Sequence, residues 1–201
     1  MVRKGLRQLK RQQTLERITD IAIALFLENG FDKVTIDEIV TKAQVSRQSF
    51  FDYFGNKENV VYAWQLKFGD TLTEAVASRP LGEPIRRTAE LAMTTSILST
   101  ISEQSLAVSK LIMETPALRN REQLLLLKLE EVLTTALTAR YPEVDSLEVQ
   151  IVAMATIGAF RVGTIIRHYN PIPPISEASI AKSFRKLWRE DGILESYSQP
   201  A

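Results

Sequence analysis

The chain of 201 residues contains no cysteine and only one histidine. Without cysteine it can form no disulfide, no zinc–thiolate site and no thiol nucleophile. The single histidine, His168, is not expected to bind a metal, because one imidazole without neighbouring cysteines does not make a site. We therefore expect neither a metal nor a cofactor. The lack of disulfides also fits a reducing, cytoplasmic location.

The sequence also lacks a long hydrophobic run and an excess of charge of either sign. The longest mainly apolar stretch, residues 151–160, is too short to span a bilayer, and no apolar segment follows the charges at the N-terminus. We therefore expect no membrane contact and no signal peptide. The formal net charge is +1, so the total charge does not imply a polyanionic partner.

No segment alternates between apolar and polar residues as a half-buried strand does, and there is no P-loop, dinucleotide fingerprint or G-x-S-x-G motif. These absences argue against the common nucleotide-binding and hydrolase classes, and we predict that the protein is not an enzyme. Nearly every segment has helical period instead. The pattern predicts an all-α chain of about nine helices, divided into residues 1–57 and a larger helical domain over residues 58–201.

Two short helices joined by a tight turn are predicted near the N-terminus. Thr35 and Glu38 form a capping box that starts the first of them. Ser46 is a good N-cap for the second, which Gly55 ends. Helices of this length bury little surface by themselves and nucleate poorly. The pair is typical of a helix-turn-helix, in which the first helix holds the second in the major groove of DNA.

The exposed side of the second short helix presents groups that can read bases. Arg47 can bond bidentately to guanine, and Gln48 to adenine. Hydroxyl groups on this helix, and the free amides at helix starts near Thr35 and Lys57, suit phosphates. The predicted DNA-contacting residues are Thr35, Ser46, Arg47, Gln48, Ser49, Phe51, Tyr53 and Lys57.

Residues 1–13 form a basic arm with five lysine or arginine residues and no acid. Such an arm is expected close to DNA phosphates. The alternative is a disordered, solvated tail, and the two interpretations are compatible because an arm can become ordered on DNA. The first regular helix is expected to begin near Thr14 and to end at Asn29-Gly30, a left-handed C-cap signal.

The stretch from Thr14 to Val61 resembles the DNA-binding domain of the TetR family. The matching parts are AIALFLENGFDKVTIDEIV and VSRQSFFDYFGNKENVV. They contain the Gly30-Phe31 pair and Thr35 before the second helix. They also contain the aromatic-x-aromatic-Phe tetrad of residues 51–54 and Lys57, three residues after it. Two positions depart from the family. Gln44 stands where the turn usually has glycine, and Phe51 lacks the hydroxyl with which the usual tyrosine contacts phosphate, a role that Tyr53 can take over.

This resemblance implies a homodimeric repressor that binds a palindromic, double-stranded DNA operator and is released by a small molecule. Family members usually dimerise through their last two helices. The sequence offers a physical basis, because the predicted eighth helix mixes Gly158 and Gly163 with large apolar residues and therefore needs burial on several sides. The ninth adds Phe184 and Trp188. An ordinary core within one chain is the alternative.

A site for a largely apolar effector is implied mainly by the resemblance, among the fourth to eighth helices. Arg161 is the sharpest polar candidate, because a charge midway along an apolar helix needs a partner. It would meet an acidic ligand or pair with Glu114 or Glu130. The candidate ligand-binding residues, each of which can instead be core, are Trp64, Phe68, Met93, Ile97, Met113, Leu125, Leu129, Phe160 and Arg161. The segment KLIMETPALRNRE also resembles actinobacterial TetR regulators, some of which respond to acyl thioesters.

The competing hypothesis is a helical protein-interaction module whose helix-turn-helix binds no DNA. Salt-dependent binding to duplex DNA that Arg47→Ala and Lys57→Ala weaken would distinguish a regulator from such a module.

Overall fold

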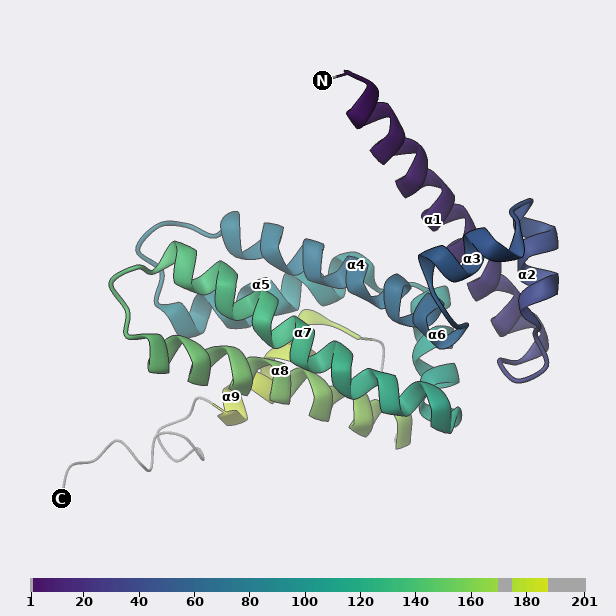
Figure 1. Ribbon diagram of the computed structural model, residues 1–201. Helices are drawn as coiled ribbons and strands as arrows, with labels where there is room; N and C mark the ends of the chain where they lie inside the picture. The colour runs from purple at the N-terminus through teal and green to yellow at the C-terminus, as the bar shows by residue number, and fades with distance from the viewer. Residues whose placement is uncertain (1, 170–174, 188–201) are drawn as a thin grey trace. The chain divides into compact units, whose positions relative to one another are not determined.

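The computed structural model describes residues 2–169 and 175–187, with their side chains apart from those of residues 2–6, 167, 168, 183 and 185–187. All regular structure in these ranges is helical, which confirms the all-α class (Figure 1). The helices are α1 (Val2–Asn29), α2 (Ile36–Ala43), α3 (Arg47–Tyr53), α4 (Glu58–Ala77), α5 (Ile85–Thr100), α6 (Glu103–Glu114), α7 (Pro116–Arg140), α8 (Ser146–Tyr169) and α9 (Glu177–Leu187). The side chain of His168 and all of Trp188 lie outside the described residues.

Packing divides the chain into two compact units, each made of two segments. The first unit comprises the residues up to Lys67 together with Glu103–Gln123, and the second comprises Phe68–Ser102 together with the chain from Leu124 onward. Helices α4 and α7 therefore contribute to both units. The functional boundary expected after residue 57 stays a prediction.

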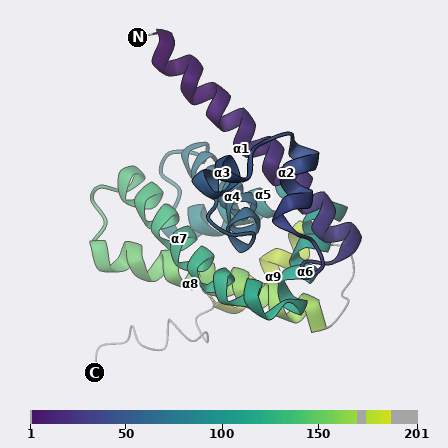
Figure 2. The same cartoon turned by 45° about the vertical axis from the view of Figure 1, so that its right-hand side comes forward.

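The first unit is held together by the apolar face of α1. Ile18, Ala22 and Phe26 are fully buried at helical spacing, and α2 and α3 add Ile39 and Phe50 to the same core. Figure 2 shows α2 beside the C-terminal half of α1, and α3 packs on α2. Full burial of a large apolar side chain contributes about 1.5–3 kcal/mol. This core therefore fixes the two short helices that would otherwise be unstable.

The start of α1 differs from the sequence-based expectation. The prediction that the first helix begins near Thr14 is wrong, because α1 already begins at Val2. Thr14 does not cap the helix, since its hydroxyl donates to the carbonyl of Lys10 at 2.9 Å. No proline lies in residues 2–13, so the helix continues through the basic arm. The predicted end is confirmed, because α1 stops at Asn29 and Gly30 has φ of 85°.

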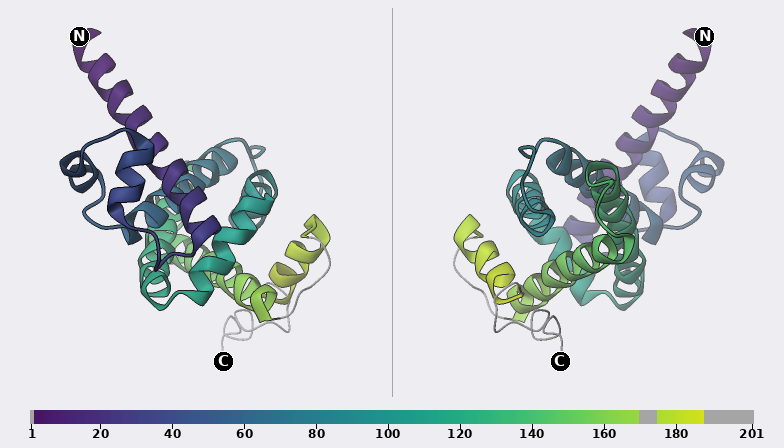
Figure 3. Two further views of the ribbon diagram at one scale, coloured as in Figure 1. Left: turned by 90° about the vertical axis from the view of Figure 1, so that its right-hand side faces the viewer. Right: turned by 90° about the vertical axis from the view of Figure 1, so that its left-hand side faces the viewer.

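The second unit contains α5, α8 and α9, which pack on one another (Figure 3). Met93 of α5, Leu133 of α7 and Val152 of α8 are buried. Phe68 of α4 stacks on Phe160 of α8, with 5.4 Å between the ring centroids and 14° between the ring planes. Helix α9 adds buried Phe184, so five helices supply the apolar interior of this unit, and α4 and α8 meet through aromatic rings.

A polar cluster lies at the connection between α4 and α5. The carboxylate of Glu83 accepts bonds from Nε and Nη2 of Arg79 at 2.9 and 2.7 Å. The hydroxyl of Tyr141 donates to the backbone carbonyl of Glu83 at 2.8 Å. The bonds from Arg79 hold the pKa of Glu83 below its usual 4.5; burial opposes this shift, and a further bond from Thr88 supports it. The ion pair thus joins the two ends of the connection.

We expect Glu83→Gln to lower the free energy of unfolding at neutral pH by about 1.5–3 kcal/mol, the usual range for a hydrogen bond to a charged group. Because the folded state lowers the pKa of Glu83, its stabilising effect is present above pH 4.5 and is lost as the pH falls through the folded pKa. Urea unfolding at a series of pH values should show the two proteins converging below pH 4.5. Glu143→Gln, at an exposed site in the same unit, is the control. A difference that persists undiminished in acid would contradict this.

Candidate nucleic-acid interface

A capping box fixes the start of α2. The N–H of Glu38 donates to the Thr35 hydroxyl at 3.2 Å, and the N–H of Thr35 donates to Oε2 of Glu38 at 2.7 Å. These bonds, first from the Thr35 backbone and then from its hydroxyl, hold the pKa of Glu38 below 4.5. The predicted capping box is therefore confirmed. Phosphate binding near Thr35 stays a prediction.

The turn between α2 and α3 depends on a left-handed backbone at Gln44. Gln44 has φ of 52° and ψ of 47°, and its N–H donates to the carbonyl of Thr41 at 3.2 Å. Among the described residues no other non-glycine residue has a positive φ. A side chain in this conformation costs roughly 1–2 kcal/mol. Buried Val40 and Ala43 on α2 offset that cost, so the turn stays tight without the usual glycine.

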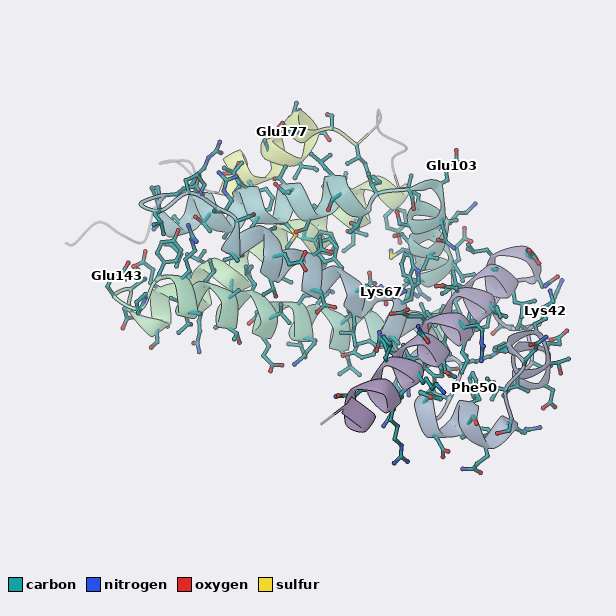
Figure 4. All side chains as sticks on the ribbon, turned by 90° about the horizontal axis from the view of Figure 1, so that it is seen from above. Lys42, Phe50, Lys67, Glu103, Glu143 and Glu177 are labelled. Atoms are coloured by element: carbon teal, nitrogen blue, oxygen red, sulfur yellow. The ribbon has the colours of Figure 1, made fainter. Side chains whose placement is uncertain are left out.

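Helix α3 packs inward through aromatic residues and leaves its other side exposed. Phe50, labelled in Figure 4, is fully buried, and Phe54 nearly so. At the helix start, the N–H of Ser49 donates to Oγ of Ser46 at 3.0 Å, which confirms the predicted N-cap. Ser49 and Tyr53 are half-buried. Of the predicted residues from Ser46 to Tyr53, the exposed ones are Ser46, Arg47, Gln48 and Phe51. The segment beginning at Ser46 thus faces outward, as a base-reading helix must.

The two predicted base-reading side chains are each bound to a carboxylate. Nη1 of Arg47 donates to both carboxylate oxygens of Asp37, on α2, at 2.8 and 3.0 Å. Nε2 of Gln48 donates to Oδ1 of Asp52, one turn further along α3, at 2.8 Å. The sequence-based site included neither acid. The i, i+4 spacing of Gln48 and Asp52 could have indicated their bond. The pairing of Arg47 with Asp37 depends on the turn between the helices, and no local signal reveals it.

Lys57 uses its ammonium group within the first unit. Its Nζ donates to the carbonyls of Phe31 and Val34 at 2.7 and 3.1 Å and lies 4.4 Å from the centroid of the Phe31 ring. These bonds fix the loop that precedes α2. A phosphate contact by Lys57 stays a prediction. The guanidinium of Arg11 lies 5.6 Å from the ring centroid of Tyr53, which connects the basic part of α1 to α3.

Residues 18–63 match the family model described as bacterial regulatory proteins of the tetR family. They form a TetR-family domain. The match extends from the buried face of α1 through α2 and α3 into α4, which are the helices that build and hold the exposed side of α3. The TetR resemblance of the sequence is therefore confirmed.

Known proteins extend this comparison beyond the TetR-family domain. The chain is 32% identical to TcmR, an HTH-type transcriptional regulator of Streptomyces glaucescens, over 79 residues, which are 39% of this chain and 35% of TcmR. The match therefore spans about a third of that relative. A TetR-family regulator from Mesorhizobium loti superposes with a TM-score of 0.60 at 14% identity, covering 87% of this chain and 92% of that one. SmeT in complex with triclosan superposes with a TM-score of 0.58 at 17% identity, covering 85% of this chain and 90% of the SmeT chain. These structures show a shared fold.

The candidate ligand-binding residues are divided between the two units. Trp64 packs against the core of the first unit, and Met113 on α6 belongs to that unit as well. The candidates in the second unit include buried Met93, Leu125 and Leu129, half-buried Ile97 and the stacked pair Phe68 and Phe160. Ligand contact by any of these residues stays a prediction.

The expectation that Arg161 is a buried charge is wrong. Its side chain is exposed on α8, as are those of Val162 and Ile165. The apolar character of α8 suggested enclosure on all sides, but the described part of the chain covers only one side of this helix. Arg161 therefore needs neither Glu114 nor Glu130 as a buried partner.

Proposed function

We propose that this chain is a homodimeric transcription repressor that binds a palindromic DNA operator and releases it when a small molecule binds. The outward-facing α3 carries this proposal, with Arg47 and Gln48 exposed on a TetR-family domain. The relative TcmR, an HTH-type transcriptional regulator, supports the assignment to transcription. The family resemblance favours repression over activation.

Selection of bound duplexes from random DNA tests this function. We expect an enriched palindrome, because two α3 helices related by twofold symmetry read the same half-site on opposite strands. Binding should weaken steeply with salt, because phosphate contacts release counterions. If no sequence is enriched, the protein-interaction module becomes the better hypothesis.

The exposed side of α8 supports the proposed dimer. Its exposed apolar residues recur at intervals of three or four, with a glycine at the centre of the series: Leu147, Ile151, Met154, Gly158, Val162 and Ile165. A Cβ atom added at Gly158 would meet no atom within 4 Å in the part of the chain that the structure describes, so a second helix has room to approach. A contiguous apolar stripe on a helix is typical of an interaction surface. We assign this α8 stripe to the partner subunit.

The α8 stripe also explains why this helix resembles a membrane span in composition. Ser146–Ile166, 21 residues with a hydropathy of 1.7, is long and apolar enough to cross a membrane, and 28% of its window is buried. This segment is longer than residues 151–160, the mainly apolar stretch that is too short to span a bilayer. One such helix is weak evidence for a membrane, and a dimer interface accounts for its exposed side. A cytoplasmic location therefore stays part of the proposal.

The proposed effector is largely apolar and binds in the second unit. The stacked rings of Phe68 and Phe160 support this, because they join α4, which also reaches the first unit, to α8. The related fold of SmeT was solved with triclosan bound. An effector that releases DNA must bind more tightly to the arrangement that cannot hold the operator. A compound that binds tightly and leaves operator affinity unchanged would contradict the mechanism.

The basic arm is expected to add phosphate contacts. Arg7 and Arg11 lie in register with Ile18 and Ala22 at i, i+4, i+11 and i+15, so they share the side of α1 that packs against the other helices of the first unit. The proximity of Arg11 to Tyr53 supports this direction. We expect the double variant Arg7→Ala and Arg11→Ala to depend less on salt. The slope of the logarithm of the binding constant against the logarithm of the salt concentration should become less steep by about 0.9 for each phosphate that the arm no longer neutralises.

Fluorescence anisotropy with the selected operator at several salt concentrations measures this slope. The matched control is Gln13→Ala, also exposed but on the opposite side of α1, which should leave the slope unchanged. An unchanged slope in the arginine double variant would show that the arm does not contact phosphate.

A further inference from the structure

Both predicted base-reading side chains are held by an acid in the free protein, and neither acid belongs to the predicted site. Asp37 binds Arg47 across the turn, and Asp52 binds Gln48 along α3. The two acids come from different helices. Each binds its own base-reading side chain, called a reader below, independently of the other. A carboxylate beside DNA weakens binding, because it repels the phosphates. The presence of one next to each reader therefore needs a physical reason.

The geometry of each bond leaves the reader free to contact a base. Both bonds from Arg47 to Asp37 use Nη1, which leaves Nη2 and Nε for the two acceptors of guanine. The bond from Gln48 to Asp52 uses one hydrogen of Nε2, which leaves the second hydrogen and Oε1 for adenine. Because a carboxylate only accepts hydrogen bonds, it also holds Nε2 of the Gln48 amide, and not Oε1, toward Asp52. The acids can therefore remain bound while the readers contact DNA.

Fold stability explains neither bond. The bond between Gln48 and Asp52 lies on an exposed helix surface, where an i, i+4 pair contributes little to folding. The side chains of Arg47 and Asp37 are 59% and 67% exposed, and exposed ion pairs of this kind contribute little to folding. A long side chain on a surface loses rotamer freedom when it docks on a base, and a neighbour that already orients it reduces this cost.

We propose that Asp37 and Asp52 are positioning residues that set the sequence specificity of DNA binding. This inference rests on the proposed function. Each acid orients a reader for its cognate base and, through its charge, weakens binding to every duplex. Removing the charge while keeping the shape should therefore move two quantities in opposite directions. Affinity for unrelated DNA should rise, and the preference for the operator over unrelated DNA should fall.

The test uses Asp37→Asn and Asp52→Asn in the full chain, with dissociation constants measured by fluorescence anisotropy at one salt concentration. The probes are the operator selected by the parent protein and a scrambled duplex of the same length and composition. For each variant we expect affinity for the scrambled duplex to rise about two- to fivefold, since one repelling charge per subunit is removed. The ratio of the two affinities should fall roughly tenfold. A neutral amide accepts a weaker hydrogen bond than a carboxylate and can turn its N–H toward the reader instead, and a misdirected bidentate contact discriminates less well between bases.

Asp32→Asn is the matched control, because Asp32 is exposed in the loop before α2 and this variant removes the same charge. It should leave the affinity ratio unchanged. Thermal unfolding confirms that all three variants are folded. A variant that tightens binding to both duplexes equally would show an effect of charge alone and overturn the inference, as would an unchanged ratio. If the parent protein prefers no sequence at all, the proposed function itself fails, and that result is separate from any effect of the variants.

Discussion

Gly158→Glu is expected to convert the protein from a dimer to a monomer and to lower operator affinity at least about 100-fold, because bivalent binding is abolished. The substitution places a charge at the centre of the α8 stripe, where the proposed partner helix comes closest. An unpaired charge in a buried interface costs about 3–5 kcal/mol. Sedimentation equilibrium measures the mass, and fluorescence anisotropy measures the affinity.

The variant subunit itself should fold, which separates loss of the dimer from loss of the structure. A Cβ atom at this position meets no atom of the described residues within 4 Å, and glutamate favours a helix interior over glycine by roughly 0.5–1 kcal/mol. The helical circular dichroism signal should therefore be retained. Thr138→Glu puts the same charge on an exposed site of α7 and should stay dimeric. A Gly158→Glu protein that remains a dimer would place the interface on another surface.

Helix starts could be predicted wherever a side chain caps the backbone. Thr35 and Ser46 cap α2 and α3 as expected, and Asp145 accepts the N–H of Leu147 at 2.9 Å at the start of α8. These signals are local, so the sequence contains them in full. The start predicted near Thr14 is wrong because a threonine hydroxyl can either cap a helix or donate to a carbonyl one turn earlier within it. The choice depends on whether the residues before it are helical, which no local pattern near Thr14 decides.

The exposed side of a helix could be predicted for α3 and not for α8. On α3, buried Phe50 and Phe54 define one inward side and leave Arg47 outside. On α8, apolar residues occur on all sides, and helical periodicity does not tell which neighbour covers each side. The sequence of α8 therefore predicts an interior position for Arg161, although its side chain is exposed. A surface that a second subunit covers has the same composition as a core, so the sequence of one chain does not separate them.

Apart from the bond between Gln48 and Asp52 within α3, the parts of the candidate site that sequence reasoning missed are contacts between elements. Asp37 reaches Arg47 only because Gln44 adopts a left-handed backbone that sets the angle between α2 and α3. Lys57 reaches the carbonyls of Phe31 and Val34 only because α4 folds back beside the loop before α2. The residue types were recognisable in the sequence. Their partners depend on tertiary packing, and for Lys57 the partner is backbone within the domain.

Arg47→Ala is expected to weaken binding to the selected operator at least about 30-fold. Each bidentate contact of arginine with guanine contributes about 1–3 kcal/mol of discrimination, and the substitution removes two of them from a symmetric dimer. Binding to a scrambled duplex should weaken only a few-fold, because the arginine charge acts there through salt-dependent attraction alone. The operator recovered by a new selection should have relaxed base preference at one position in each half-site.

Arg47→Lys separates the shape of the guanidinium from its charge. Lysine keeps the charge and lacks the planar fork, so it should keep the affinity for scrambled DNA and lose most of the preference for the operator. Lys42→Ala removes a charge from an exposed site on α2, labelled in Figure 4, and should leave the base preference intact. If Arg47→Ala and Lys42→Ala weaken both duplexes to the same extent, Arg47 acts on phosphates. The bases would then be read by Gln48 or by groups outside α3.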